Sequence, residues 1–282
     1  MESIKELRRM LQEEKVHPKG WSRPFGYKTL QRGPSIYITR FLLLFPITPN
    51  QITITALLMG IVGCVFVFQD SWELKITGIA ALYVHTLLDR VDGEVARYKK
   101  RASLKGIYLD EINHLIIPPV FFLSFTFGMP PFTVVPDLFL YIGGVTAALS
   151  FIVIRITNSL SQLIFIKKYI KSPELFFLPN TTHGNGDIDG NLEKPELFDI
   201  PARLFHLTQE FFIILLVLGA VMMFERLTLL DYMFYPLTSW LTLVFGVLLF
   251  LIAVENVIKG WFIVEFNIAR ISRGFKKFQN NV

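Results

Sequence analysis

Residues 236–262 read PLTSWLTLVFGVLLFLIAVENVIKGWF, and no charged residue occurs in this stretch before Glu255. A helix needs about 20 consecutive, mainly apolar residues to cross the hydrocarbon core of a bilayer. The strict alternation of apolar and polar residues that marks the strands of an outer-membrane barrel does not recur along the chain. The stretch therefore predicts a membrane-spanning helix.

Five more apolar runs approach the same length. With the first stretch, the predicted spans lie near 53–69, 73–97, 107–128, 134–168, 207–224 and 236–262. The run at 134–168 exceeds the thickness of the hydrocarbon core, so we expect part of it to project into water or to tilt. The chain of 282 residues is 52% hydrophobic and only 18% charged. We predict an all-α integral membrane protein with six transmembrane helices.

A shorter apolar stretch precedes the first span. Residues 35–45 (SIYITRFLLLF) are followed by Pro46 and Pro49, which break a helix, so we expect an interfacial amphipathic helix along the membrane surface. The chain starts without a short apolar run behind a basic segment, which argues against a cleaved signal peptide. We therefore divide the chain into an N-terminal cytoplasmic segment with the interfacial helix (1–52), a transmembrane domain (53–262) and a basic cytoplasmic tail (263–282).

Lysine and arginine are concentrated in alternate connecting segments. They lie before the first span, after the fourth, after the sixth, and between the second and third at Lys99, Lys100, Arg101 and Lys105. By the positive-inside rule these segments and both termini are cytoplasmic. The formal net charge of +5 is mild. It suggests anchoring at the membrane surface and anionic ligands, and it gives no reason to expect a nucleic-acid partner.

The longest polar stretch is a predicted cytoplasmic loop, 171–206. Residues 185–196 within it match the pattern of an EF-hand calcium loop, with Asn185 at the first position. Pro195 inside the loop disfavours flanking helices, so a solvated turn-rich loop is the main interpretation and a Ca²⁺ site is the alternative. The single cysteine, Cys64, lies in an apolar run, which excludes an intrachain disulfide and a cysteine metal site.

Acidic residues gather between the second and third spans, in DRVDGEVARYKKRASLKGIYLDEINH, residues 89–114. Asp89 and Asp92 are three residues apart and share one helix face, and Asp110 and His114 are four apart and share another. Ionisable groups at membrane depth are costly, so they usually face a protein interior or a water-filled cavity. Three carboxylates from two helices predict a pocket suited to Mg²⁺, Mn²⁺ or Ca²⁺.

Two further residues of this segment suit a phosphate ligand. Gly93 removes a side chain where a base or a phosphate could approach the backbone. Arg97 continues the same face and can hold a phosphate with two parallel hydrogen bonds. The alternative is an ion-paired helix end, with Asp89 and Asp92 against Arg90 and Arg97. That alternative accounts neither for Gly93 nor for Asp110 with His114 on the next span.

The spacing Asp89-x-x-Asp92-Gly93-x-x-Ala96-Arg97, followed by Gly106-x-x-x-Asp110, resembles the signature of the CDP-alcohol phosphotransferases, the class I CDP-alcohol phosphatidyltransferases. The short helix followed by residues 48–53 (TPNQIT) is also similar to the way this family begins its first span. The resemblance covers approximately residues 35–130, and the rest of the chain only by its six-span topology.

The resemblance implies a site with two divalent cations, Mg²⁺ or Mn²⁺, held by Asp89, Asp92 and Asp110 against the pyrophosphate of a CDP-linked donor. It implies that the donor is contacted by Thr48, Pro49, Asn50, Gln51, Gly93, Arg97, Ser103 and Gly106. It also implies a homodimer with the active site at the cytoplasmic face. The expected reaction is displacement at the β-phosphorus, with transfer of a phospho-alcohol group to an alcohol acceptor and release of CMP, in phospholipid or related lipid synthesis.

His114 is a departure from the family pattern, which has a fourth aspartate there. The change removes a negative charge and leaves the second cation one carboxylate short. Histidine titrates near neutral pH, so it is chemically reasonable as the general base on the acceptor hydroxyl, and it is also a possible metal ligand. The alternative is a family member with altered catalysis that binds CDP-lipid as a sensor or scaffold.

Cations elsewhere in the chain suit an acceptor that carries a phosphate or carboxylate. Arg155 in the fourth span and Arg203 before the fifth are the candidates; pairing with nearby carboxylates is the alternative for both. A remote alternative function is a cation-coupled transporter. Such proteins usually place their ion sites near the bilayer midplane within repeated halves, whereas here the cluster lies at one surface and the sequence has no internal repeat.

Overall fold

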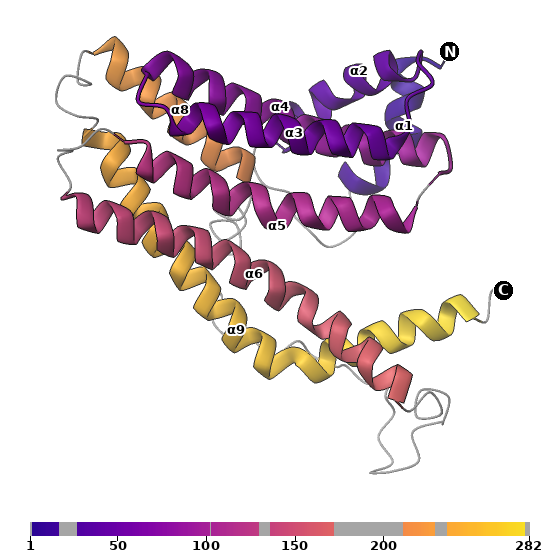
Figure 1. Ribbon diagram of the computed structural model, residues 1–282. Coiled ribbons are helices and arrows are strands. Elements are labelled where there is room, and N and C mark those ends of the chain that lie inside the picture. The colour runs from indigo at the N-terminus through magenta and orange to yellow at the C-terminus, as the bar shows by residue number, and fades with distance from the viewer. Residues whose placement is uncertain are drawn as a thin grey trace. The chain divides into compact units, whose positions relative to one another are not determined.

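The computed structural model describes residues 2–16, 27–101, 103–129, 136–171, 211–228 and 236–279. The regular structure within these ranges is helical (Figure 1). The elements are α1 (Ile4–Val16), a π-helix η1 (Tyr27–Arg32), α2 (Gly33–Leu42), α3 (Pro49–Phe68), α4 (Trp72–Tyr98), α5 (Leu104–Phe127), α6 (Asp137–Lys171), α8 (Phe211–Leu227) and α9 (Pro236–Gln279).

The apolar runs of the sequence correspond to α3, α4, α5, α6, α8 and α9, and the predicted interfacial helix corresponds to α2. Among the described residues, three helical segments are long and apolar enough to cross a membrane: Pro49–Phe68, Asp137–Leu160 and Leu237–Trp261. This fits an α-helical membrane protein. Helix α9 includes residues 263–279, which belong to the segment predicted as a basic cytoplasmic tail.

Helix α1 was not predicted from the sequence. It begins with a capping box, in which the Glu6 carboxylate accepts from the Ser3 backbone N–H at 2.8 Å and the Ser3 hydroxyl accepts from the Glu6 N–H at 3.3 Å. At the same end, the Tyr98 hydroxyl of α4 donates to the Glu2 carboxylate at 2.8 Å, which holds the pKa of Glu2 below its usual value. The start of the chain is therefore tied to the end of α4.

The chain divides into two compact units. One comprises Met1–Phe151 with Pro201–Phe250, and the other comprises Ile152–Ile200 with Leu251–Val282. Helices α6 and α9 contribute to both. Within the second unit, a Cβ on Gly260 of α9 would lie 3.2 Å from the Thr157 methyl of α6, so these two helices pack closely there.

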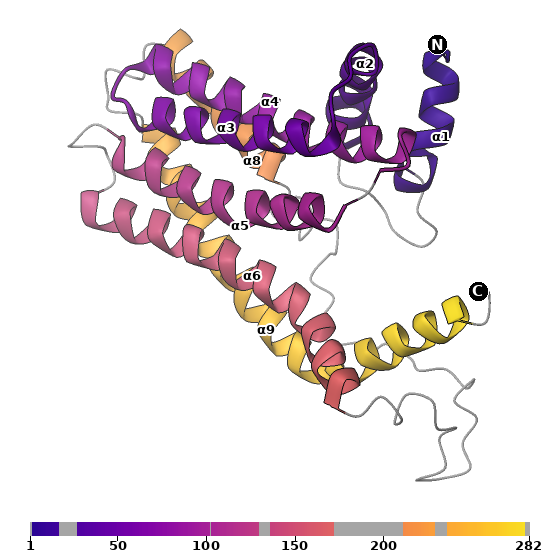
Figure 2. The same ribbon diagram turned by 45° about the vertical axis from the view of Figure 1, so that its right-hand side comes forward.

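The first unit is built on the packing of α3 against α4. A Cβ added to Gly78 of α4 would lie 2.7 Å from the Gly63 carbonyl oxygen of α3, so the two backbones touch. Small residues allow this approach, which matters in a bilayer because apolar side chains gain little there by leaving lipid. Helix α5 runs along α3, and Ile117 of α5 fills the space over Gly60. Figures 1 and 2 show α3 and α4 side by side with α5 next to them.

Two buried charges fix the ends of helices away from the acidic cluster. The Lys75 ammonium of α4 donates to the Val67 carbonyl of α3 at 3.0 Å and to the Gly128 carbonyl after α5. A cation at two helix C-termini satisfies carbonyls that have no partner within the helices. In the same unit the Glu225 carboxylate of α8 accepts from the backbone N–H of Thr238 at 2.9 Å, at the N-terminus of α9.

Candidate metal centre

Three of the predicted ligands converge between α4 and α5. Asp89, Asp110 and His114 each offer one ligand atom, and these atoms all lie within 4.8 Å of one another. The His114 Nε2 atom is 3.5 Å from an Asp89 carboxylate oxygen and 3.6 Å from one of Asp110. The helical spacing in the sequence predicted that these side chains share a pocket, and the structure brings them together.

The donor set fits a divalent cation. Two neighbouring ligands on an octahedral ion at ~2.1 Å lie roughly 3 Å apart, and the two separations from His114 Nε2, 3.5 and 3.6 Å, are close to this value. The Asp89 side chain is 5% exposed, and within the described residues its Oδ1 atom has no hydrogen bond, its neighbour being His114 Nε2 at 3.5 Å. An unpartnered buried carboxylate oxygen is costly, and a cation would satisfy it. The other oxygen, Oδ2, is 3.5 Å from Arg90 Nη1, so part of the ion-paired alternative is also present.

Asp92 lies outside this group of three. Its carboxylate is buried and accepts a hydrogen bond of 2.6 Å from the Thr53 hydroxyl of α3. Asp92, the third predicted carboxylate, is therefore oriented by α3, whereas Asp110 lies on α5. Its role as a metal ligand stays a prediction.

His85 is one turn before Asp89 on α4 and is fixed by α3. Its Nδ1 donates to the Ala56 carbonyl at 2.9 Å, because a carbonyl oxygen can only accept. A neutral ring held in this way carries its acceptor nitrogen at Nε2. The ring is buried and close enough to Asp89 and His114 to interact with them electrostatically.

Gly93 and Arg97 lie together, as their spacing predicted. A Cβ on Gly93 would be 3.3 Å from Nη1 of Arg97, so the guanidinium lies over the glycine. The Arg97 Nε–H donates to the Leu11 carbonyl of α1 at 3.1 Å. The orientation of the guanidinium is thus set by a helix that the sequence did not predict.

The remaining predicted donor contacts come from the N-termini of α3 and α5. Thr48 and Gln51 form a capping box at the start of α3. The Ser103 hydroxyl, which caps α5, donates to the Asn50 side-chain oxygen at 3.1 Å and accepts from the Gly106 N–H at 3.0 Å. Helix N-termini favour anions through their exposed N–H groups and dipole. Contacts of these residues with CDP stay a prediction.

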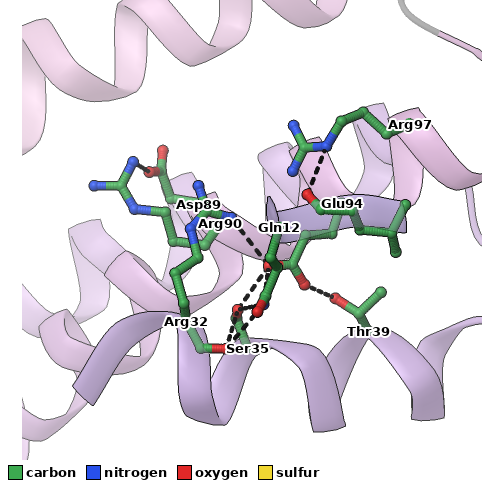
Figure 3. A network of polar contacts seen from close by, with 9 residues as sticks. Gln12, Arg32, Ser35, Thr39, Asp89, Arg90, Glu94 and Arg97 are labelled. Atoms are coloured by element: carbon green, nitrogen blue, oxygen red, sulfur yellow. Dashed lines mark hydrogen bonds and ion pairs between the residues drawn. The ribbon is translucent and has the colours of Figure 1, made fainter. Parts of the chain in front are cut away.

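The residue that sequence reasoning missed is Glu94 of α4, which lies between Gly93 and Arg97 in the sequence. Its carboxylate is completely buried and ion-paired with Arg32, whose side chain is 6% exposed. Four donors from the N-terminal elements reach it (Figure 3): Arg32 Nη1 at 3.0 Å, Gln12 Nε2 at 2.8 Å, Ser35 Oγ at 2.8 Å and Thr39 Oγ1 at 2.5 Å. The only sign of this residue in the sequence is a glutamate within the acidic segment, and the neighbouring residues do not indicate which side chains bind it.

The structure does not test the proposed acceptor residues. Arg155 lies on α6 in the second compact unit. Arg203, the 185–196 calcium-loop match and nearly all of the 171–206 loop lie outside the described residues. Their predicted roles are therefore kept as proposals.

Comparison with known proteins identifies the segment that holds the cluster. The model of the CDP-alcohol phosphatidyltransferase family matches residues 46–182. Over this segment the chain is similar to that family. A relative from Thermococcus kodakarensis, named Bifunctional IPC transferase and DIPP synthase, is 38% identical over 112 residues, which cover 39% of this chain and 24% of the relative. The resemblance of the acidic signature to the CDP-alcohol phosphatidyltransferases is thereby confirmed.

Proposed function

We propose that the protein is a membrane enzyme that transfers a phospho-alcohol group, of phosphatidyl type, from a CDP-linked donor to an alcohol acceptor and releases CMP. The observation that carries the proposal is the convergence of Asp89, Asp110 and His114 from two helices inside the segment that matches the family. The relative's name includes a transferase and a synthase activity, in agreement with group transfer.

The donor would lie with its pyrophosphate between the acidic cluster and Arg97. The guanidinium over Gly93 can give two parallel hydrogen bonds to phosphate oxygens. The N-termini of α3 and α5 would contact the nucleotide through Thr48, Pro49, Asn50, Gln51, Ser103 and Gly106. Asp89, Asp92 and Asp110 would hold two divalent cations, Mg²⁺ or Mn²⁺, and the second cation would be bound more weakly than the first. When bound, these cations offset negative charge on the pyrophosphate and on the leaving group.

The acceptor hydroxyl would attack the β-phosphorus. The new bond joins the acceptor oxygen to this phosphorus, the bond from the phosphorus to the bridging oxygen breaks, and CMP leaves with that oxygen. We assign the hydroxyl proton to His114 Nε2, the ring nitrogen that faces both carboxylates. One nitrogen cannot accept this proton while it binds a cation, so in this mechanism the cations rest on the aspartates.

We further propose six transmembrane helices, an interfacial α2, cytoplasmic termini and a cytoplasmic active site in a homodimer. Single cysteines introduced into connecting segments, labelled from one side of sealed vesicles, test the orientation. Cys64 is the one native cysteine and is buried, so it gives little background. Labelling of 99–101 and of 69–71 from the same side would contradict the topology.

For the acceptor we propose only a chemical class, an alcohol that bears a phosphate or carboxylate. Its proposed binding residues are Arg155 and Arg203. A second candidate function is binding of CDP-lipid without turnover, which His114 favours because it removes one carboxylate from the family pattern. The test is release of CMP by purified protein with CDP-diacylglycerol and a panel of acceptor alcohols, in Mn²⁺ and in EDTA. Turnover that persists in EDTA would contradict the mechanism. Tight CDP-lipid binding with no CMP release from any acceptor would favour the second function.

A further inference from the structure

Helix α1 packs against the C-terminal part of α4, the helix that carries Asp89 and Asp92. Leu7 and Leu11 of α1 form a buried cluster with Ile36 of α2, against which Tyr98 of α4 packs. The Gln12 amide extends this contact, because its Nε2 donates to the Glu94 carboxylate at 2.8 Å and to the Arg32 carbonyl at 2.8 Å. An apolar cluster and a buried polar network thus hold α1 in one place.

This placement brings one backbone carbonyl of α1 to Arg97. The Leu11 carbonyl accepts from the Arg97 Nε–H at 3.1 Å, and Figure 3 shows Arg97 beside the Glu94 network on α4. The guanidinium then lies over Gly93, with Nη1 3.3 Å from where a Cβ would be. Arginine carries its donors in a rigid planar fork, so fixing Nε also fixes the direction of the remaining N–H groups.

We propose that α1 is a positioning element of the donor site: its Leu11 carbonyl holds Arg97 over Gly93 so that the guanidinium meets the pyrophosphate of a nucleoside diphosphate already oriented. The inference rests on the proposed function, since it takes Arg97 as a donor contact. Fixing a flexible side chain before binding avoids the entropy otherwise lost on binding. From the usual cost of immobilising one such side chain, the loss of α1 should weaken CDP binding roughly 2- to 12-fold.

The experiment detaches α1 without touching the site. Leu7→Asp places a charge in the completely buried cluster and should release the helix. Met10→Asp makes the same charge change on the same helix at a side chain that is 54% exposed, and it serves as the matched control. Hydrogen exchange at residues 4–16 shows whether α1 is released. Mn²⁺ affinity by electron paramagnetic resonance shows whether the metal centre is intact.

CDP affinity is measured by calorimetry with the full chain in nanodiscs and Mn²⁺, for wild type, Leu7→Asp, Arg97→Ala and the double variant. We expect Leu7→Asp to weaken CDP binding by the factor given, Met10→Asp to leave it unchanged, and Leu7→Asp to have no further effect in the Arg97→Ala background. If Leu7→Asp loses Mn²⁺ binding, Gln12→Ala replaces it, because that change removes hydrogen bonds of α1 without placing a charge in the apolar cluster.

The outcomes separate this inference from the proposed function. If Leu7→Asp weakens CDP binding equally in the wild-type and Arg97→Ala backgrounds, α1 only stabilises the fold. Unchanged CDP affinity with a released α1 would also overturn the positioning role, while leaving the proposed function intact. Failure of the wild type to bind CDP at all would overturn the proposed function and the inference with it.

Discussion

Glu94→Gln tests the buried network most directly, because the substitution keeps the shape of the side chain and removes its charge. Glu94 and Arg32 are 0% and 6% exposed, so the change leaves a buried guanidinium facing a neutral amide. Removing one partner of a buried ion pair costs about 3–5 kcal/mol. The glutamine keeps one acceptor oxygen for the hydrogen bonds, which offsets about 1 kcal/mol. We therefore expect a net destabilisation of about 2–4 kcal/mol.

The assay is thermal unfolding in detergent, followed by tryptophan fluorescence at one fixed scan rate. At roughly 2–4 °C per kcal/mol for a chain near this size, Glu94→Gln should lower the apparent Tm by roughly 4–16 °C. Arg32→Gln should act similarly. The double variant should lose less than the sum of the two, because two amides can bond to each other. Arg101→Gln, at an exposed position, is the control and should change the Tm little.

Two results would refute this reasoning. A Tm for Glu94→Gln within about 2 °C of wild type, less than the lower end of the expected change, would mean that the carboxylate is not desolvated. Losses that simply add in the double variant would mean that the two side chains do not act as a pair.

Three further predictions concern the site. His114→Ala should lower CMP release by at least ~100-fold while leaving CDP affinity unchanged, and an active variant in a turnover assay would exclude the general-base role. Asp89→Asn or Asp110→Asn should weaken Mn²⁺ binding by at least ~10-fold in an electron paramagnetic resonance titration, whereas His114→Asp should strengthen binding of a second ion. Stronger Mn²⁺ binding by the asparagine variants and weaker binding by His114→Asp would count against the aspartates as ligands. Gly93→Ala should weaken CDP binding measured by calorimetry, because its Cβ would lie 3.3 Å from Arg97 Nη1, and Gly93→Leu should block it; unchanged affinity in both would rule out this face as the donor site.

The helices and part of the site could be predicted because they depend on local patterns. The length of an apolar run predicts a spanning helix without knowledge of its neighbours. Helical spacing likewise places Asp110 beside His114, and the two lie 3.6 Å apart in the structure. The pairing of α4 with α5 was expected from the shared chemistry of their acidic residues, and Asp89 does lie in the same cluster.

The contacts that orient the site could not be predicted in the same way. The Thr53 hydroxyl binds Asp92 across 39 residues of sequence, and Gln12 binds Glu94 across 82. Such pairs depend on which helix faces pack together, and nothing in the local pattern specifies this. Helix α1 itself could have been predicted from the sequence, because Ser3 and Glu6 have the spacing of a capping box.

The Glu94 network also constrains the order in which the protein is assembled in the cell. Ribosomes add roughly 5–20 residues per second. Thr39 precedes Glu94 by 55 residues and Gln12 precedes it by 82. The donor groups of the N-terminal elements therefore exist for roughly 3–16 s before the carboxylate that joins them is synthesised. During this interval Arg32 lacks its Glu94 partner. The arrival of α4 at the membrane thus completes the N-terminal elements in the same step that delivers Asp89 and Asp92.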